Sequence, residues 1–322
     1  MMHQAQSAAG EMSGRLAWAG FPAGLRAVVE DYFGARVDQA ETPQGGFSQD
    51  MACRLTFSNA RQAFVKGCGP HSGGESYALH RAEARIAAAL PVTVPAPRLL
   101  AEFEADGWIV VAFEAIDGRP PAQPWKPDEL DGILSTVTLL AEVVNPSPID
   151  VPTVAERLAD TFQGWRRLRV AREADEDLRW LDPWALRHLD ELAGLETRWG
   201  EAAAGPGLAH ADLRADNMLI TEDRVIVVDW PWACRAVAWF DLLGMLPSIQ
   251  LAGGPEPGTI WNGHPVARDA DSDAVTTVLA ARTGFFVRQA RQPAPPGAPT
   301  LRAFQQAQGE VAMRWLAARM QR

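Results

Sequence analysis

The residues best suited to chemistry lie in two short segments in the last third of the sequence. The segment from His210 to Asn217 contains Asp212 and, five residues after it, the amide of Asn217; Asp229 follows a short apolar run. One carboxylate in such an arrangement can accept a hydroxyl proton, and an amide oxygen with a second carboxylate can hold a divalent cation on a nucleotide triphosphate. This order predicts transfer of a phosphoryl group from a nucleotide to an alcohol.

The apolar runs between these polar residues predict the strands that must position them. Residues 218–221 and 225–228 are short strand candidates, with an acidic turn between them. Such a hairpin would place Asp229 at the end of a buried strand, where an unpaired carboxylate is costly, so we expect a metal or a hydrogen-bond donor beside it. Taken singly, each of the three polar residues also fits a plainer role in a turn or a cap.

The first third of the sequence predicts a small antiparallel sheet. A period-two alternation over 51–57 and a second strand over 62–66 are separated by a turn at 58–59 and preceded by two glycines. A helix is expected over 75–90, ended by Pro91, and another strand pair over 98–103 and 108–113. Beyond a connector at 114–121 the pattern becomes helical. The expected helices cover 127–145, 152–173, 183–201, 236–250, 272–290 and 299–318.

The two polar segments together resemble the signature of the aminoglycoside phosphotransferase family, a branch of the protein-kinase-like superfamily. That family carries His-Gly-Asp-Leu, an Asn five positions after the Asp, and an Asp-Trp or Asp-Phe pair after the next strand. Here Ala211 stands where the glycine is usual, while the spacing of Asp212, Asn217 and Asp229 matches. The resemblance extends over roughly residues 35 to 320, and it is weak outside these motifs.

The resemblance implies an α+β, protein-kinase-like two-lobed fold. A small antiparallel-sheet N-lobe with one main helix would precede a larger, mostly helical C-lobe. The corresponding boundaries are a flexible N-terminus at 1–20, a nucleotide-binding N-lobe at 21–114, a hinge connector at 115–121, and a C-lobe with the catalytic loop and acceptor site at 122–322.

The resemblance also assigns roles in the catalytic segment. Asp212 would be the catalytic base, and Asn217 and Asp229 would hold Mg²⁺. Arg214 would meet the charge of the transferring phosphoryl group or be simply a solvated arginine. His210 and Asp241 are expected to be structural supports, Asp241 as a helix cap and a brace of the loop.

The nucleotide half of the reaction is expected in the sheet. Lys66, at the end of a strand, is similar to the lysine that pairs the phosphates of ATP, and Glu83 on the next helix would orient it, with Glu75 as a rival. The other predicted nucleotide contacts are Gly45, Gly46, Phe47 and Ser48 in a loop over the phosphates, and backbone groups of Glu114 and Ile116 at the adenine edge.

Composition narrows the partners. A net charge of −10 argues against nucleic acid and is compatible with a cationic small molecule. Three cysteines without CxxC spacing predict neither a zinc site nor disulfides, and they favour the cytoplasm. No apolar run is long enough to span a membrane. Acidic residues at Glu256, Asp269, Asp271 and Asp273 could contact an amine-bearing acceptor, although the last three also fit a polar helix start.

Phosphorylation of a hydroxyl on a small molecule, such as an aminoglycoside-like antibiotic or another amino-alcohol, is therefore the expected function. A non-catalytic kinase-like protein that binds nucleotide or a partner is the alternative. Retention of Asp212, Asn217, Asp229 and Lys66 together favours the enzyme. A protein kinase is disfavoured because no Ala-Pro-Glu segment and no long activation loop follow Asp229.

Overall fold

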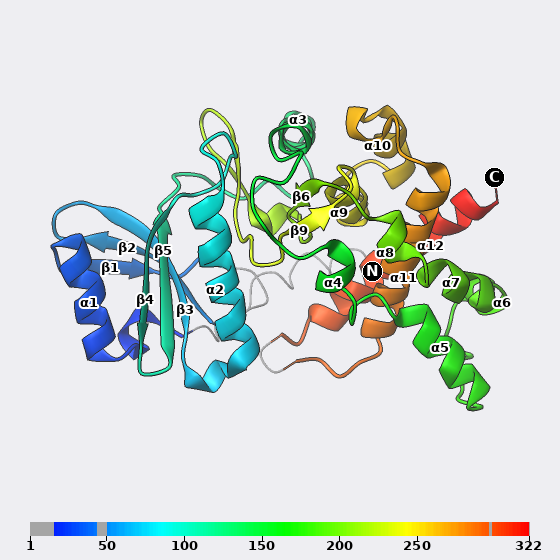
Figure 1. The fold of residues 1–322 in the computed structure, drawn as a ribbon, viewed down its shortest axis with the longest axis horizontal. Helices are drawn as coiled ribbons and strands as arrows, with labels where there is room; N and C mark the ends of the chain where they lie inside the picture. The colour runs from blue at the N-terminus through cyan, green and yellow to red at the C-terminus, as the bar shows by residue number, and fades with distance from the viewer. Residues whose placement is uncertain (1–15, 44–49, 296–297, 322) are drawn as a thin grey trace. The chain divides into compact units, whose positions relative to one another are not determined.

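The computed structural model describes residues 16–43, 50–295 and 298–321, which form two compact units (Figure 1). The first unit comprises the described residues up to Pro120 with 216–232 and the described part of 295–299; the second comprises 121–215, 233–294 and 300–321. The hairpin that carries Asn217 and Asp229 thus groups with the first unit, although it falls within the range expected for the helical lobe.

The first unit is built on a five-stranded antiparallel sheet with the order β1-β2-β3-β5-β4. Its strands are β1 (Val37–Glu41), β2 (Met51–Phe57), β3 (Gln62–Cys68), β4 (Leu99–Ala105) and β5 (Trp108–Glu114). Helix α1 (Ala23–Phe33) lies over one face of this sheet and α2 (Gly73–Ala89) over the other. The β2–β3 hairpin, the β4–β5 pair and α2 were all predicted from the sequence, whereas β1 was not.

The alternation of side chains separates the two faces of the sheet. Odd-numbered residues of β2, such as Cys53, and Val65 of β3 are buried in the core beside α1. Cys68 of β3 and Val111 of β5 are buried in the smaller core beside α2. Because residues two apart on a strand share a face, Lys66 lies on the α2 side together with Cys68.

The first unit also contains the short hairpin of β7 (Met218–Ile220) and β8 (Val225–Val227). It is joined to the rest of the unit by backbone hydrogen bonds. The amide of Val227 donates to the carbonyl of Pro95 at 2.7 Å, and Arg119 and Ile220 exchange bonds at 3.0 and 2.8 Å. These bonds explain why a segment so late in the sequence belongs with the sheet.

The second unit is helical apart from one short strand pair, β6 (Gly207–Ala209) with β9 (Cys234–Ala236). Its helices are α3 (Pro127–Val143), α4 (Val154–Arg157), α5 (Gly164–Glu173), α6 (Pro183–Arg187), α7 (Leu189–Glu196), α8 (Trp199–Ala202), α9 (Phe240–Leu251), α10 (Pro257–Gly263), α11 (Ser272–Gln289) and α12 (Leu301–Met320). With the five-stranded sheet, they confirm the predicted α+β class. None of the described helices is both long and apolar enough to cross a membrane.

Two of the long helices expected from the sequence are broken into shorter ones. The range 152–173 forms α4 and α5, and the range 183–201 forms α6, α7 and α8. A capping box between Thr153 and Glu156 starts α4, and α5 begins anew at Gly164. A Cβ atom at Gly164 would lie only 1.9 Å from the carbonyl oxygen of Gly284 in α11. The first residue of α5 must therefore be a glycine for the two backbones to pack this closely.

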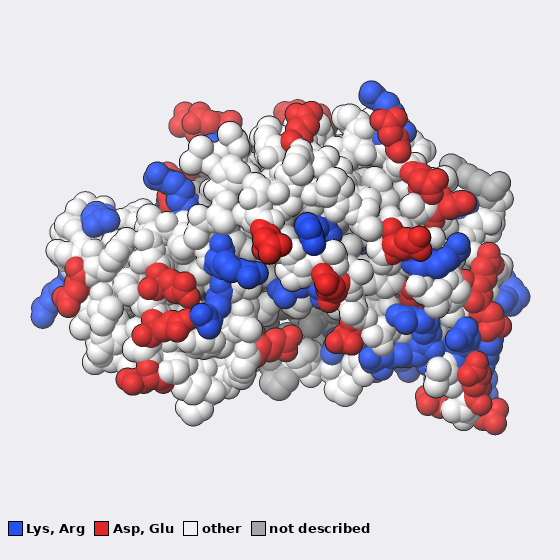
Figure 2. Space-filling view, in the orientation of Figure 1, with Lys and Arg blue, Asp and Glu red and all other residues white. Residues whose placement is uncertain are grey.

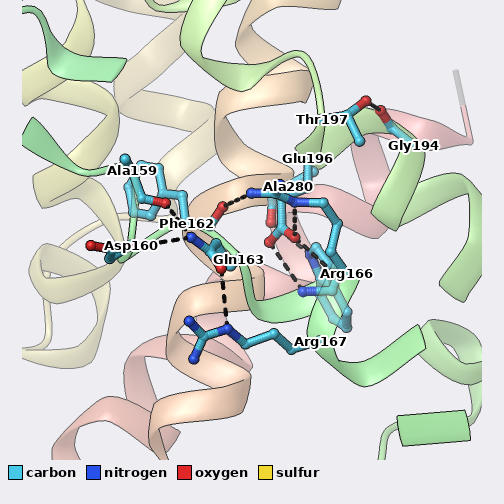
Figure 3. Close-up of polar contacts among 11 residues, drawn as sticks. Ala159, Asp160, Phe162, Gln163, Arg166, Arg167, Gly194, Glu196, Thr197 and Ala280 are labelled. Carbon is cyan, nitrogen blue, oxygen red and sulfur yellow. Dashed lines mark hydrogen bonds and ion pairs between the residues drawn. The ribbon is translucent and has the colours of Figure 1, made fainter. Parts of the chain in front are cut away.

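A buried carboxylate holds the start of α5 in place (Figure 3). Glu196 at the end of α7 is fully buried and accepts the amides of Trp165 at 3.0 Å and Arg166 at 2.8 Å. The indole of Trp165 in turn donates to the carbonyl of Ala280 in α11 at 2.7 Å. Glu196 therefore satisfies two of the amides left unpaired at the start of a helix and links α7, α5 and α11.

Charged side chains are intermixed on the face of the molecule drawn in Figure 2. The arginines of α5 lie close to acids: Arg172 is 2.5 Å from Asp190, and Arg169 is 3.8 Å from Glu173. Nearby acidic side chains thus partly neutralise the positive charge of α5.

Replacement of Glu196 by alanine is expected to lower the free energy of unfolding by about 2–4 kcal/mol, because amide groups would be left unsatisfied at a buried helix start. Glu191→Ala, on the exposed side of the same helix, should change it by less than about 1 kcal/mol. Chemical denaturation of the two variants checks this. Equal effects would show that Glu196 does not support the helix.

Candidate functional site

Within the first unit, one ammonium group lies between two carboxylates from different parts of the chain. Nζ of Lys66 is 2.9 Å from both carboxylate oxygens of Glu83 and 2.5 Å from Oδ1 of Asp229. Lys66 comes from β3, Glu83 from α2, and Asp229 from the residues after β8. The structure therefore brings together three residues that the sequence predicted for one site.

Local structure explains how these side chains meet. Lys66 points to the α2 side of the sheet, and the apolar core formed by Cys68, Ala84, Ile109, Val111 and Phe113 fixes α2 against that side. Glu83 is 4% exposed and faces the sheet, whereas Glu75, its rival in the sequence, is exposed in the first turn of α2.

Mutual attraction keeps this buried group charged. Burial disfavours the charged form of Lys66, but Asp229 and Glu83 raise its pKa above the ordinary value for lysine. Burial raises the pKa of Glu83, and Lys66 acts in the opposite direction. The lysine thus stays cationic and is held in one position, where it can meet an anionic ligand.

The β7–β8 hairpin places Asn217 and Asp229 at the same end. Met218 pairs with Val227, and the amide of Val228 donates to the carbonyl of Asn217 at 3.0 Å. Asp229 follows directly and has a left-handed backbone with φ of 69°. Asn217 is 5% exposed, and the side chain of Asp229 is 40% exposed. An amide and a carboxylate oxygen from one hairpin end form a donor set that suits a hard cation such as Mg²⁺.

In the second unit, a half-buried aspartate braces the start of the predicted catalytic loop. Asp241, at the start of α9, accepts the amides of His210 at 2.7 Å and Ala211 at 2.8 Å. Burial raises its pKa, and His210 and these amides act against that rise. His210 is fully buried, and its Nδ1 accepts the amide of Asp212 at 3.2 Å. Both residues occupy supporting positions around the loop.

The backbone of Ala211 explains the glycine that is usual in the resembling motif. Its φ is 67°, which is the left-handed region favoured by glycine. An L-residue with a Cβ atom is disfavoured there by about 1–2 kcal/mol. The two hydrogen bonds to Asp241 hold the loop in this conformation despite that cost.

Two arginines lie near Asp212 in the same unit, and the sequence analysis missed one of them. Nη2 of Arg214 is 3.5 Å from a carboxylate oxygen of Asp212. Arg282, from α11, is half-buried; loss of hydration lowers its pKa to about 10, while Asp212 and Asp241 oppose that shift. Its guanidinium lies over Gly244 of α9, where a Cβ atom would be 3.0 Å from Nη1. An arginine in the apolar middle of α11, between Val278 and Val287, was the signal that could have pointed to it.

The other predicted contacts are only partly described. Gly45, Gly46, Phe47 and Ser48 lie outside the described residues. The amide of Glu114 donates to the carbonyl of Arg98 at 2.9 Å, and the carbonyl of Ile116 accepts from the guanidinium of Arg54.

The acidic residues considered for the acceptor include one helix cap. Asp271 caps α11 by accepting the amide of Ala274 at 2.7 Å. Asp271 thus has the helix-start role that the sequence offered as an alternative to contact with the acceptor.

Ala211→Gly is expected to raise the free energy of unfolding by about 1 kcal/mol, because glycine adopts the left-handed conformation without strain. Ala82→Gly, in the middle of α2, should lower it by about 1 kcal/mol, because glycine is a poor helix former. Thermal or urea unfolding measures both. A loss of stability in Ala211→Gly would contradict the backbone argument.

Solved structures share this fold over nearly the whole chain. Choline kinase LicA from Streptococcus pneumoniae matches with a TM-score of 0.59 at 13% identity, covering 92% of this chain and 100% of that one. A thermostable mutant of aminoglycoside phosphotransferase APH(4)-Ia, in ternary complex with AMP-PNP and hygromycin B, matches with a TM-score of 0.59 at 14% identity, covering 91% and 98%. An aminoglycoside phosphotransferase from Alicyclobacillus acidocaldarius matches with a TM-score of 0.52 at 17% identity, covering 88% and 92%.

At these identities the likeness shows a kinase-like fold. No curated protein sequence matches the chain. The sequence pattern of one family, described as the phosphotransferase enzyme family, matches residues 39–263, well over half of the chain. The chain therefore belongs to the phosphotransferase enzyme family.

Proposed function

We propose that this protein transfers the γ-phosphoryl group of ATP to a hydroxyl group of a small molecule. The observation that carries the proposal is the largely buried Lys66 ammonium, which lies between Glu83 and Asp229. A lysine held by a helix glutamate is the arrangement that positions nucleotide phosphates in the kinase superfamily. The family membership and two structural neighbours, bound to ADP or AMP-PNP, support ATP as the donor.

Magnesium fits the donor atoms at the end of the β7–β8 hairpin. Asn217 and Asp229 would hold the ion through oxygen atoms, and the bound ion would neutralise charge on the phosphates. Asp229 also contacts Lys66 at 2.5 Å. The Asp229 carboxylate would thus contact both the Lys66 ammonium and the metal ion, so that the ammonium and the ion can bind the same triphosphate.

Asp212 is proposed as the base that accepts the proton of the attacking hydroxyl. Asp241 and His210 hold the loop around Asp212 by hydrogen bonds to its amides. The backbone that carries the Asp212 carboxylate is therefore held in one conformation. Arg214, 3.5 Å from Asp212, and Arg282 supply positive charge near the carboxylate. These cations could meet the negative charge of the transferring phosphoryl group.

The acceptor is proposed to be a hydroxylated small molecule of the amino-alcohol or aminoglycoside type. Neighbours in structure are a choline kinase and an aminoglycoside phosphotransferase bound to hygromycin B. Choline carries a quaternary ammonium group beside its hydroxyl, and aminoglycosides carry amines beside theirs. The net charge of −10 favours such cationic acceptors. The identity of the acceptor would decide between a role in antibiotic resistance and a role in metabolism. We expect the reaction to take place in the cytoplasm.

The nucleotide half can be tested by covalent labelling, because the sequence contains only two lysines, Lys66 and Lys126. A lysine-reactive acyl-phosphate derivative of ATP should label Lys66, and excess ATP with Mg²⁺ should protect it. Lys126 has a side chain that is 67% exposed and serves as the internal control, which ATP should not protect. Mass spectrometry identifies the labelled peptide; equal protection of both lysines, or none, would contradict the proposal.

The phosphoryl transfer can be tested by measuring ATP consumption and phosphorylated product with aminoglycosides, other hydroxylated antibiotics, choline-like amines and sugars. Asp212→Ala should lower kcat by about 10²–10⁴-fold on an accepted substrate, because the general base is lost. Asp223→Ala, at an exposed turn of the β7–β8 hairpin, should keep the activity. Undiminished turnover in Asp212→Ala would disprove the assignment of the base. If no acceptor on the panel is phosphorylated while Lys66 is labelled as expected, the protein is a nucleotide binder instead.

A further inference from the structure

A second polar cluster lies in the first unit, on the same side of the sheet as Lys66. Asp50, Cys68 and His80 each offer one ligand atom, and these three atoms lie within 4.8 Å of one another. Cys68 and His80 are buried, and Asp50 is half-buried. The proposed transfer reaction uses none of these residues.

The geometry of strand and helix brings the three residues together. Met51 pairs with Gly67 in the β2–β3 hairpin, so Asp50 lies across from Cys68. Cys68 is two residues after Lys66, and His80 is three residues before Glu83 on α2. These spacings keep each pair on one face of its element. The sheet and helix therefore meet at two polar contacts in succession: Lys66 with Glu83, and Cys68 with His80 and Asp50.

Nε2 of the His80 imidazole has no hydrogen-bond partner among the described residues. Its side chain is 9% exposed, and Nε2 lies 3.3 Å from a carboxylate oxygen of Asp50 without the geometry of a hydrogen bond. Burial of an unsatisfied imidazole nitrogen is costly. Burial disfavours ionisation of Asp50, but contacts with His80, Ser72 and Ser76 lower its pKa below the usual value, so it is available as a carboxylate ligand.

We propose that Asp50, Cys68 and His80 form a binding site for a thiophilic divalent cation, of which Zn²⁺ is the representative. Zinc takes sulfur, imidazole nitrogen and carboxylate oxygen at about 2.0–2.3 Å in tetrahedral geometry, which puts ligand atoms about 3.3–3.8 Å apart. Nε2 of His80 and a carboxylate oxygen of Asp50 already lie 3.3 Å apart, and all three ligand atoms lie within 4.8 Å of one another, so a contraction of at most about 1.5 Å reaches that spacing. A water would complete the tetrahedron.

The ligand set separates this site from the magnesium position. Thiolate and imidazole select zinc, cobalt or copper, whereas Mg²⁺ prefers oxygen ligands alone. Burial raises the pKa of the Cys68 thiol to about 12, so the metal-free residue is protonated. Binding replaces the thiol proton with a sulfur–metal bond and releases that proton to water.

A bound ion would join three different elements of the first unit. Asp50 precedes β2, Cys68 ends β3 and His80 belongs to α2. The ion would thus fix the α2 helix against the strand that carries Lys66. Its expected effect is a higher unfolding temperature, because a ligand that binds only the folded chain stabilises it.

The test uses the full chain, stripped of metal and titrated with Co²⁺ in excess Mg²⁺. One equivalent should produce a thiolate-to-cobalt charge-transfer band and the visible bands of tetrahedral cobalt, and Zn²⁺ should displace it. Cys68→Ala should abolish the charge-transfer band. Cys53→Ala is the matched control, since Cys53 is equally buried on a neighbouring strand but faces the α1 side, and it should keep the band.

A second readout guards against failure to fold. Zn²⁺ should raise the unfolding temperature of the parent and of Cys53→Ala but not of Cys68→Ala, and Asp50→Asn should weaken Co²⁺ binding at least about tenfold. Absence of a thiolate band in the parent, or a band that survives Cys68→Ala, overturns the proposal. Neither readout depends on phosphoryl transfer, so the two proposals can fail independently.

Discussion

The attraction between the Lys66 ammonium and two carboxylates is the interaction on which the first unit depends. Three segments that are far apart in the sequence each contribute one charged group to it. Removing Lys66 would leave two neighbouring carboxylates without a counter-charge, one of them on the buried Glu83, which costs more than the ion pair contributes. In the proposed function, this arrangement would present a phosphate with a lysine already held in position.

The second unit depends on a comparable use of carboxylates that accept backbone amides. Asp241 accepts two loop amides, and Glu196 accepts the first amides of α5. Through Trp165 and the close approach of Gly164 to Gly284, α5 is packed on α11, the helix that carries Arg282. The surroundings of Asp212 are therefore fixed by helices whose own ends are satisfied by acids.

Much of this arrangement could be predicted from the sequence because local patterns determine it. Strict alternation located the β2–β3 hairpin, and the spacing of polar residues located the segment around Asp212. Two long helices were predicted where the structure has five shorter ones, since helical periodicity continues across breaks that only tertiary packing imposes. The contact of Gly164 with α11 has no counterpart in local sequence.

Arg282 and the cluster around His80 escaped the sequence analysis for a related reason. Their partners are distant in the sequence, and no spacing rule connects a helix arginine near the end of the chain to a loop aspartate seventy residues earlier. The spacing of the cysteines predicted no zinc site, because that criterion does not consider histidine and carboxylate ligands. Asp50, Cys68 and His80 come together only through strand pairing and helix packing.

The scarcity of lysine gives the protein an unusual spectroscopic simplicity. Arginine supplies nearly all of its positive charge, and only Lys66 and Lys126 carry side-chain amines. A sample labelled isotopically at lysine would show two side-chain resonances, one from a solvated ammonium and one from an ammonium between carboxylates. The protonation and surroundings of the buried charge could then be followed directly in solution, without any substitution in the site.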